Sequence, residues 1–131
     1  MAADILIDTS IWIDFFRNKL LPSSERLIRL LDRDRALITG IVLTELIRGV
    51  RNDSEWKRLR ELLKPVPTIS PNEETWEKAG TLAYKLSRKG LTVFTVDVVI
   101  ATIAIENSVS LFSTDRHFQQ IAAHSDLKLW V

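Results

Sequence analysis

The sequence predicts an α/β fold in which helices cover both faces of a central, mostly parallel sheet of about five short strands. Short apolar runs alternate along the chain with segments whose apolar residues recur at helical spacing, and this alternation is typical of strand–helix–strand units. Leu, Ile, Val and Phe make up about a third of the 131 residues, which is enough to bury a hydrophobic core. The length suits one domain, so we expect residues 1–131 to form a single unit.

The first half of the chain begins with a predicted strand and two helices. Residues 5–7 are a short apolar run that ends at Asp8, and aspartate is a common cap for a following helix. Apolar residues at helical spacing predict that helix over about 11–16 and a second one over about 26–33. The next predicted elements are a strand at 36–39 and helices at 40–50 and 56–63.

The second half is expected to continue the alternation. Residues 65–69 can form only an edge strand or a loop, because their prolines have no N–H to donate to a sheet. Ser70 and Pro71 predict the start of a long helix that ends before Gly90. Its buried face is expected to hold Trp76, Ala79, Ala83 and Leu86. The last predicted elements are a helix at 95–105, a strand at 110–114, a helix at 115–123 and a strand at 127–131.

Composition excludes several kinds of site and location. The chain has no cysteine, which excludes disulfides, thiolate zinc sites and a cysteine nucleophile, and its only histidines, His117 and His124, are too few for a histidine-rich metal site. No apolar run reaches the roughly 20 residues of a membrane helix, and residues 1–4 lack the basic start of a signal peptide. We therefore expect a soluble, cytoplasmic protein. The net charge of +1 predicts no nucleic-acid partner by itself, although residues 17–64 hold 12 Lys or Arg against seven Asp or Glu.

Four acidic residues are candidates for a functional site. Asp8 and Asp115 follow predicted strands, and open parallel sheets bind ligands at the carboxyl ends of their strands. Glu45 and Asp97 interrupt apolar helix faces, where a buried carboxylate is costly unless it is paired with a cation or a metal ion. Each also has an ordinary explanation: helix capping for the first two, the helix dipole for Asp97, and an ion pair with Arg48 for Glu45. Together, clustered carboxylates suit Mg²⁺ or Mn²⁺.

The segments around these acids lie at 5–14, 44–49, 97–101 and 113–118. In order along the chain, they resemble the four motifs of PIN-domain proteins, above all the VapC toxins of toxin–antitoxin pairs. Thr102 and the bulky residues 92–95 depart from the family pattern, but neither departure touches an acidic position. The resemblance spans the whole chain and implies a PIN-like three-layer fold.

The resemblance also implies a metal-dependent endoribonuclease. Its acidic cluster would be Asp8, Glu45, Asp97 and Asp115, with Mg²⁺ (or Mn²⁺) as cofactor and Asp8 and Asp97 as the most direct ligands. The hydroxyls of Thr9, Ser10 and Thr114 would orient these carboxylates or a bound water. The candidates for contact with the RNA backbone are Arg116, Arg48 and Arg51. We expect His117 to have a packing or surface role and assign no role to His124.

A protein partner follows from the same resemblance. VapC toxins are held inactive by an antitoxin, so a VapB-type antitoxin is expected to fill an exposed apolar groove beside the acids. We expect some of the large aromatics of the early helices, Trp12, Phe15, Phe16 and Trp56, to line it, and a fully buried Trp12 would favour an RNA-processing role instead. The resemblance also implies a homodimer.

Three alternatives compete with the toxin interpretation. Phosphoryl-transfer enzymes of the haloacid dehalogenase type need a second aspartate where Ser10 stands, and a receiver domain needs a late lysine where the chain offers only Lys128. A PIN-domain nuclease for RNA processing would have the same acids but no antitoxin. A non-catalytic PIN-like module that binds RNA or protein would be expected to lack one of the four acids, and none is missing.

Overall fold

The structure, a computed structural model, describes residues 3–131. Residues 1 and 2, which belong to the segment expected to lack a signal peptide, lie outside this range. The strands are β1 (Ile5–Ile7), β2 (Ala36–Thr39), β3 (Thr68–Ile69) and β4 (Ser110–Phe112). They form one parallel sheet in the order β3-β2-β1-β4, and β3, which follows Pro65 and Pro67, lies at an edge as predicted.

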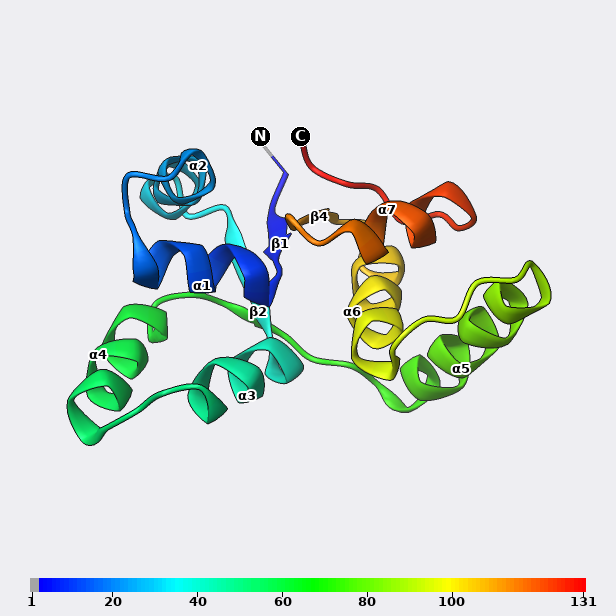
Figure 1. Ribbon diagram of the computed structural model, residues 1–131, viewed down its shortest axis with the longest axis horizontal. Coiled ribbons are helices and arrows are strands. Elements are labelled where there is room, and N and C mark those ends of the chain that lie inside the picture. Colours follow the sequence, from blue (N-terminus) through cyan, green and yellow to red (C-terminus); the bar gives the residue numbers. More distant parts are fainter. Residues whose placement is uncertain (1–2) are drawn as a thin grey trace.

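Seven helices within residues 3–131 flank this sheet. They are α1 (Thr9–Arg17), α2 (Pro22–Asp32), α3 (Gly40–Arg48), α4 (Asp53–Leu63), α5 (Glu73–Arg88), α6 (Thr95–Glu106) and α7 (Arg116–Ala123). In the view of Figure 1, α1, α2 and α4 lie to the left of β1, while α5, α6 and α7 lie to its right. Helices therefore cover both sides of a parallel sheet, as the alternating sequence pattern predicts. No helix in the described part of the chain is both long and apolar enough to cross a membrane.

The central strand β1 positions the site. All three of its residues are buried, and the Asp8 N–H extends the pairing by donating to the Phe112 carbonyl at 3.0 Å. Because β1, β2 and β4 run in parallel, their carboxyl ends meet at one edge of the sheet. The chain enters α1, α3 and the segment before α7 at that edge.

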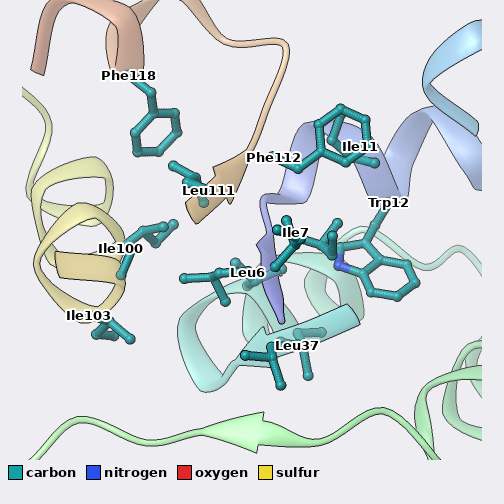
Figure 2. Packing of buried hydrophobic residues seen from close by; sticks show 14 of the residues in the cluster. Leu6, Ile7, Ile11, Trp12, Leu37, Ile100, Ile103, Leu111, Phe112 and Phe118 are labelled. Carbon is teal, nitrogen blue, oxygen red and sulfur yellow. The ribbon is translucent and has the colours of Figure 1, made fainter. Parts of the chain in front are cut away.

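The core contradicts the expectation for Trp12. Its side chain is fully buried, and Figure 2 shows it in the same cluster as Ile7, Ile11 and Leu37. Phe15 is buried as well, so neither residue lines an exposed groove. Truncating Trp12 would remove core packing worth about 3–5 kcal/mol, so such a variant reports on folding and cannot test a partner.

The start of α5 also differs from the prediction. The cap is Asn72, not Ser70: its side chain accepts from the Thr75 N–H, and the Thr75 hydroxyl side chain accepts from the Asn72 N–H, which completes a capping box. Thr75 also hydrogen-bonds to Glu106 on α6 and is buried. This turns the neighbouring Trp76 outward, and its side chain is 55% exposed instead of buried.

The end of α5 agrees with the prediction. Gly90 has a φ of +83°, a left-handed conformation that glycine adopts without strain. Leu91 then donates its N–H to the Leu86 carbonyl at 2.9 Å, which closes the last turn.

The predicted strand at 127–131 is reduced to a single parallel bridge between Leu111 and Leu129. Leu111 donates to the Lys128 carbonyl and accepts from the Trp130 N–H, so the segment still runs along β4. The Arg26 guanidinium lies 4.4 Å from the centre of the Trp130 ring, a cation–π contact that helps to hold the segment. The sheet therefore has four regular strands, close to the expected five.

Candidate active site

The four acidic residues come from four separate elements. Asp8 ends β1 and caps α1, Asp115 follows β4 and caps α7, Asp97 lies in the first turn of α6, and Glu45 lies in the middle of α3. The two caps confirm the ordinary explanation for Asp8 and Asp115, since each side chain accepts a backbone N–H from its helix. An aspartate that caps a helix can also belong to the site. Each of these helices begins near the carboxyl end of a strand, so its free N–H groups lie at the edge of the sheet where the acids gather.

Asp8 is the most buried of the four. Its Oδ2 accepts hydrogen bonds from the hydroxyls of Ser113 at 2.7 Å and Ser10 at 2.9 Å. Burial raises the pKa of Asp8 above its usual value, while the hydrogen bonds from Ser113 and Ser10 act in the opposite direction. The two serines therefore hold one carboxylate oxygen in a fixed place.

Glu45 is held by a hydroxyl as well. The Thr9 Oγ1 donates to Glu45 Oε1 at 2.7 Å and so links the first turn of α1 to α3. The alternative partner, Arg48, is exposed, and no ion pair joins it to Glu45 in the described structure. The ordinary explanation for Glu45 is therefore wrong.

Asp97 and Asp115 lie against His117. The His117 Nδ1 is 3.5 Å from Asp97 Oδ2 and 3.2 Å from Asp115 Oδ1. Burial raises the pKa of Asp97 to about 6, and the charges of Asp115, Asp8 and, more weakly, Glu45 add to this rise, with His117 opposing it. Since such charge effects fade with distance, all four carboxylates share one electrostatic neighbourhood.

His117 and Ser113 also belong to this neighbourhood, although neither is among the predicted site residues. His117 is more than a packing or surface residue, because its ring nitrogen contacts two of the acids. Ser113, not Thr114, provides the hydroxyl that holds Asp8, while Thr114 is exposed and donates its backbone N–H to Ser10 Oγ. The spacing Asp115-x-His117 was the available signal, because a helix cap and the second helical residue lie close together.

No Lys or Arg side chain within residues 3–131 forms an ion pair with any of the four acids. A cluster of carboxylates without such a partner fits a divalent cation, which prefers oxygen ligands. One ligand atom each from Asp97, Asp115 and His117 lies within 4.8 Å of the other two. The donor set present therefore fits the metal ion that the sequence predicts.

An apolar groove opens beside Glu45, between α1, α3 and α4. Its volume is about 600 Å³. It is lined by the apolar Ile13, Phe16, Leu46, Val50 and Leu59, and by the charged Arg17, Glu45, Arg51, Glu55 and Arg58. Of the arginines predicted to contact RNA, Arg51 lies at this groove, while Arg48 and Arg116 are exposed near Glu45 and Asp115 in sequence.

We predict that the metal-free protein becomes more stable as the pH falls from 7 towards 5. The pKa of Asp97 is about 6 in the folded protein against 3.8 ordinarily, so the folded state takes up this proton first. Proton uptake by the folded state alone raises the free energy of unfolding, until the unfolded chain is also protonated near pH 4. Urea unfolding in EDTA at pH 7, 6 and 5 measures the effect. Asp97→Asn should flatten the slope, and an unchanged slope would show that Asp97 titrates normally.

The site and fold match a known family. A model of the PIN domain matches residues 5–124. Ribonuclease VapC1 of Haemophilus influenzae is 31% identical over 121 residues, which cover 88% of this chain and 90% of that protein. Ribonuclease VapC11 of Mycobacterium tuberculosis is 28% identical over 128 residues, with 95% and 96% covered.

Solved structures agree with these matches. The VapBC-1 structure of nontypeable Haemophilus influenzae has a TM-score of 0.76 and 29% identity, with 96% of each chain covered. DNA-bound VapBC from Salmonella typhimurium has a TM-score of 0.80 at 22% identity, which shows the shared fold. The chain therefore belongs to the PIN-domain family, and its PIN-like fold is confirmed. Within that family its relatives are the VapC ribonucleases.

Proposed function

We propose that the protein is a metal-dependent endoribonuclease that hydrolyses RNA phosphodiester bonds, and that it is the toxin of a toxin–antitoxin pair. The observation that carries the proposal is the gathering of Asp8, Glu45, Asp97 and Asp115 in one neighbourhood without a Lys or Arg partner in the described structure. VapC1 and VapC11 are ribonucleases by name, which supports the same chemistry here. In this proposal residues 1–131 form a single PIN domain.

The cofactor in this proposal is Mg²⁺ or Mn²⁺, held by Asp8, Asp97 and Asp115 with help from Glu45. When bound, such an ion activates a water and neutralises the charge that develops on the phosphate. The protein's own contribution is to hold the carboxylates in fixed positions. Ser10 and Ser113 hold one oxygen of Asp8, and Thr9 orients Glu45.

The RNA backbone needs positive charge around an acidic pocket, because carboxylates repel phosphate. Arg116 directly follows Asp115 and is exposed. Arg48 and Arg51 lie at and beyond the end of α3, three and six residues after Glu45. We propose these three as backbone contacts at the rim of the pocket, with Arg116 the nearest in sequence to a metal-binding acid.

Cleavage of total RNA tests the proposed activity. The purified protein is incubated with Mg²⁺, with Mn²⁺ or with EDTA, beside the Asp8→Asn variant under the same conditions. We expect discrete RNA fragments with a divalent ion, and intact RNA with EDTA or with the variant. A protein that binds RNA but never cuts it would be a PIN-like binding module, and the proposal would be wrong.

The groove beside Glu45 supports an antitoxin partner of the VapB type. Its apolar lining suits the aliphatic side chains of a helix or extended segment, and its arginines suit acidic residues at the edge of that segment. Because Glu45 is part of the lining, the partner could also place a Lys or Arg among the acids and form a charge-assisted pair there. Two structures of similar fold are VapBC structures by title.

The burial of Trp12 removes one argument for the toxin interpretation and lends weight to an RNA-processing nuclease without an antitoxin. The groove still favours the toxin interpretation, because Ile13 and Phe16, on the same helix α1 as Trp12, provide apolar side chains that a partner could cover. A homodimer stays a prediction. The exposed Trp76 and Tyr84 of α5 are aromatic side chains that would suit such an interface.

A further inference from the structure

We propose that His117 is a nitrogen ligand of the metal site, and that it makes the site prefer a first-row transition ion such as Mn²⁺ over Mg²⁺. This inference rests on the proposed function and adds a residue to the four acids. It also assigns a chemical class to the ion, which the acids alone leave open, because carboxylates accept either ion.

The placement of the imidazole carries the inference. Its Nδ1 lies 3.2 Å from Asp115 Oδ1 and 3.5 Å from Asp97 Oδ2. Neighbouring ligand atoms around an ion with bonds of about 2.1 Å lie roughly 3 Å apart at right angles. The two distances from the imidazole nitrogen are therefore close to what a shared ion requires, and one ligand atom from each of the three residues lies within 4.8 Å of the other two.

The ring is held in this place by its surroundings. The backbone N–H of His117 donates to Asp115 Oδ1 at 2.9 Å, which fixes the start of α7 beside the acid. Phe94, the residue before α6, meets the imidazole edge to face at a centroid distance of 5.4 Å. Residues at the starts of both α6 and α7 thus contact the imidazole, so its side chain loses little conformational freedom when an ion binds.

A nitrogen ligand changes which ion is preferred. Mg²⁺ takes oxygen ligands and keeps several waters, so an imidazole gives it little advantage over water. Transition ions bind imidazole well, and Mn²⁺ is the weakest binder of the first-row series. Mn²⁺ therefore gives a stringent test, because an ion later in the series would gain more affinity from the nitrogen ligand than Mn²⁺ does.

Electron paramagnetic resonance of bound Mn²⁺ tests the inference without any measurement of activity. Mn²⁺ is titrated into the metal-free protein, and Mg²⁺ affinity is obtained by competition. Pulsed measurements then detect coupling between Mn²⁺ and the nitrogen of an imidazole. The variants are His117→Ala, His124→Ala and Asp97→Asn. His124 is the matched control, because it is the only other histidine of the chain and is exposed at the far end of α7.

We expect the nitrogen coupling in the wild type and in His124→Ala, and its loss in His117→Ala. Mn²⁺ affinity should fall by at least about tenfold in His117→Ala, the lower end of what the loss of a supporting residue costs. Mg²⁺ affinity should change much less, because a water replaces the imidazole. Absent nitrogen coupling, or an equal loss for both ions, would overturn the inference while leaving the acidic site intact. Mn²⁺ binding that survives Asp97→Asn unchanged would instead overturn the proposed metal site itself.

Discussion

Asp97→Asn is expected to reduce RNA cleavage by more than about 100-fold, the upper end of the loss seen when only a residue supporting a metal ligand is changed. The amide keeps the shape of the side chain but removes the negative charge that a divalent ion requires. Asp97 is also the acid on which burial and the other carboxylates act most clearly, since they raise its pKa to about 6. The rate of fragment formation from a defined RNA in Mn²⁺ measures the effect.

The control for this prediction separates chemistry from folding. Asp126→Asn makes the same change at an exposed position outside the site and should cleave like the wild type. Without metal, Asp97→Asn should melt at the same or a higher temperature than the wild type at pH 7, because it removes repulsion among the acids. A variant that unfolds would mean that Asp97 is structural, and a variant that still cleaves would mean that it is no ligand.

Ile13→Asp is expected to weaken binding of the antitoxin by about 30-fold or more, which corresponds to about 2 kcal/mol, the threshold of an interface hot spot. Ile13 lines the groove and is 41% exposed, so the free protein should tolerate the change. A partner that covers it would bury an uncompensated charge among apolar side chains. Titration calorimetry with the proposed VapB-type antitoxin measures the affinity.

Two comparisons make this second experiment decisive. Leu20→Asp introduces the same charge at an 81% exposed leucine that does not line the groove, and it should bind as the wild type does. RNA cleavage by the free Ile13→Asp protein should survive, because the residue is not among the acids. Equal affinities for all three proteins would place the partner elsewhere, and the absence of any binding partner would favour the RNA-processing interpretation.

The sequence indicated the acids because each one breaks a simple pattern. Asp8 stops a buried strand, and Asp97 interrupts an otherwise apolar helix whose next seven residues are all buried. Such interruptions of a local pattern can be recognised from the sequence alone. The hydrogen bond from Ser113 to Asp8 is not, because it joins residues 105 positions apart through the pairing of β1 with β4.

The errors at α1 and α5 have a different cause. On α1, the apolar Trp12 and Ile13 are neighbours that point to opposite sides, one into the core and the other into the groove. Hydrophobicity alone cannot tell a core face from a binding face. On α5, Ala79 and Leu86 are buried as predicted, but the first buried residue is Thr75 of the capping box, and Trp76 beside it lies in solvent.

Glu45 belongs to two surfaces, since it is part of the acidic neighbourhood and also part of the groove lining. The wall of the groove formed by α3 therefore cannot change freely over evolution, because most replacements of Glu45 would disturb the acids and its bond to Thr9. The opposite wall includes the exposed Arg58 of α4, which has no such constraint. Related proteins that share this arrangement would diverge in partner choice on α4 while keeping α3 nearly constant. One cell could then hold several such nucleases, each bound only by its own partner. The helix that determines this choice, α4, would take no part in cleavage.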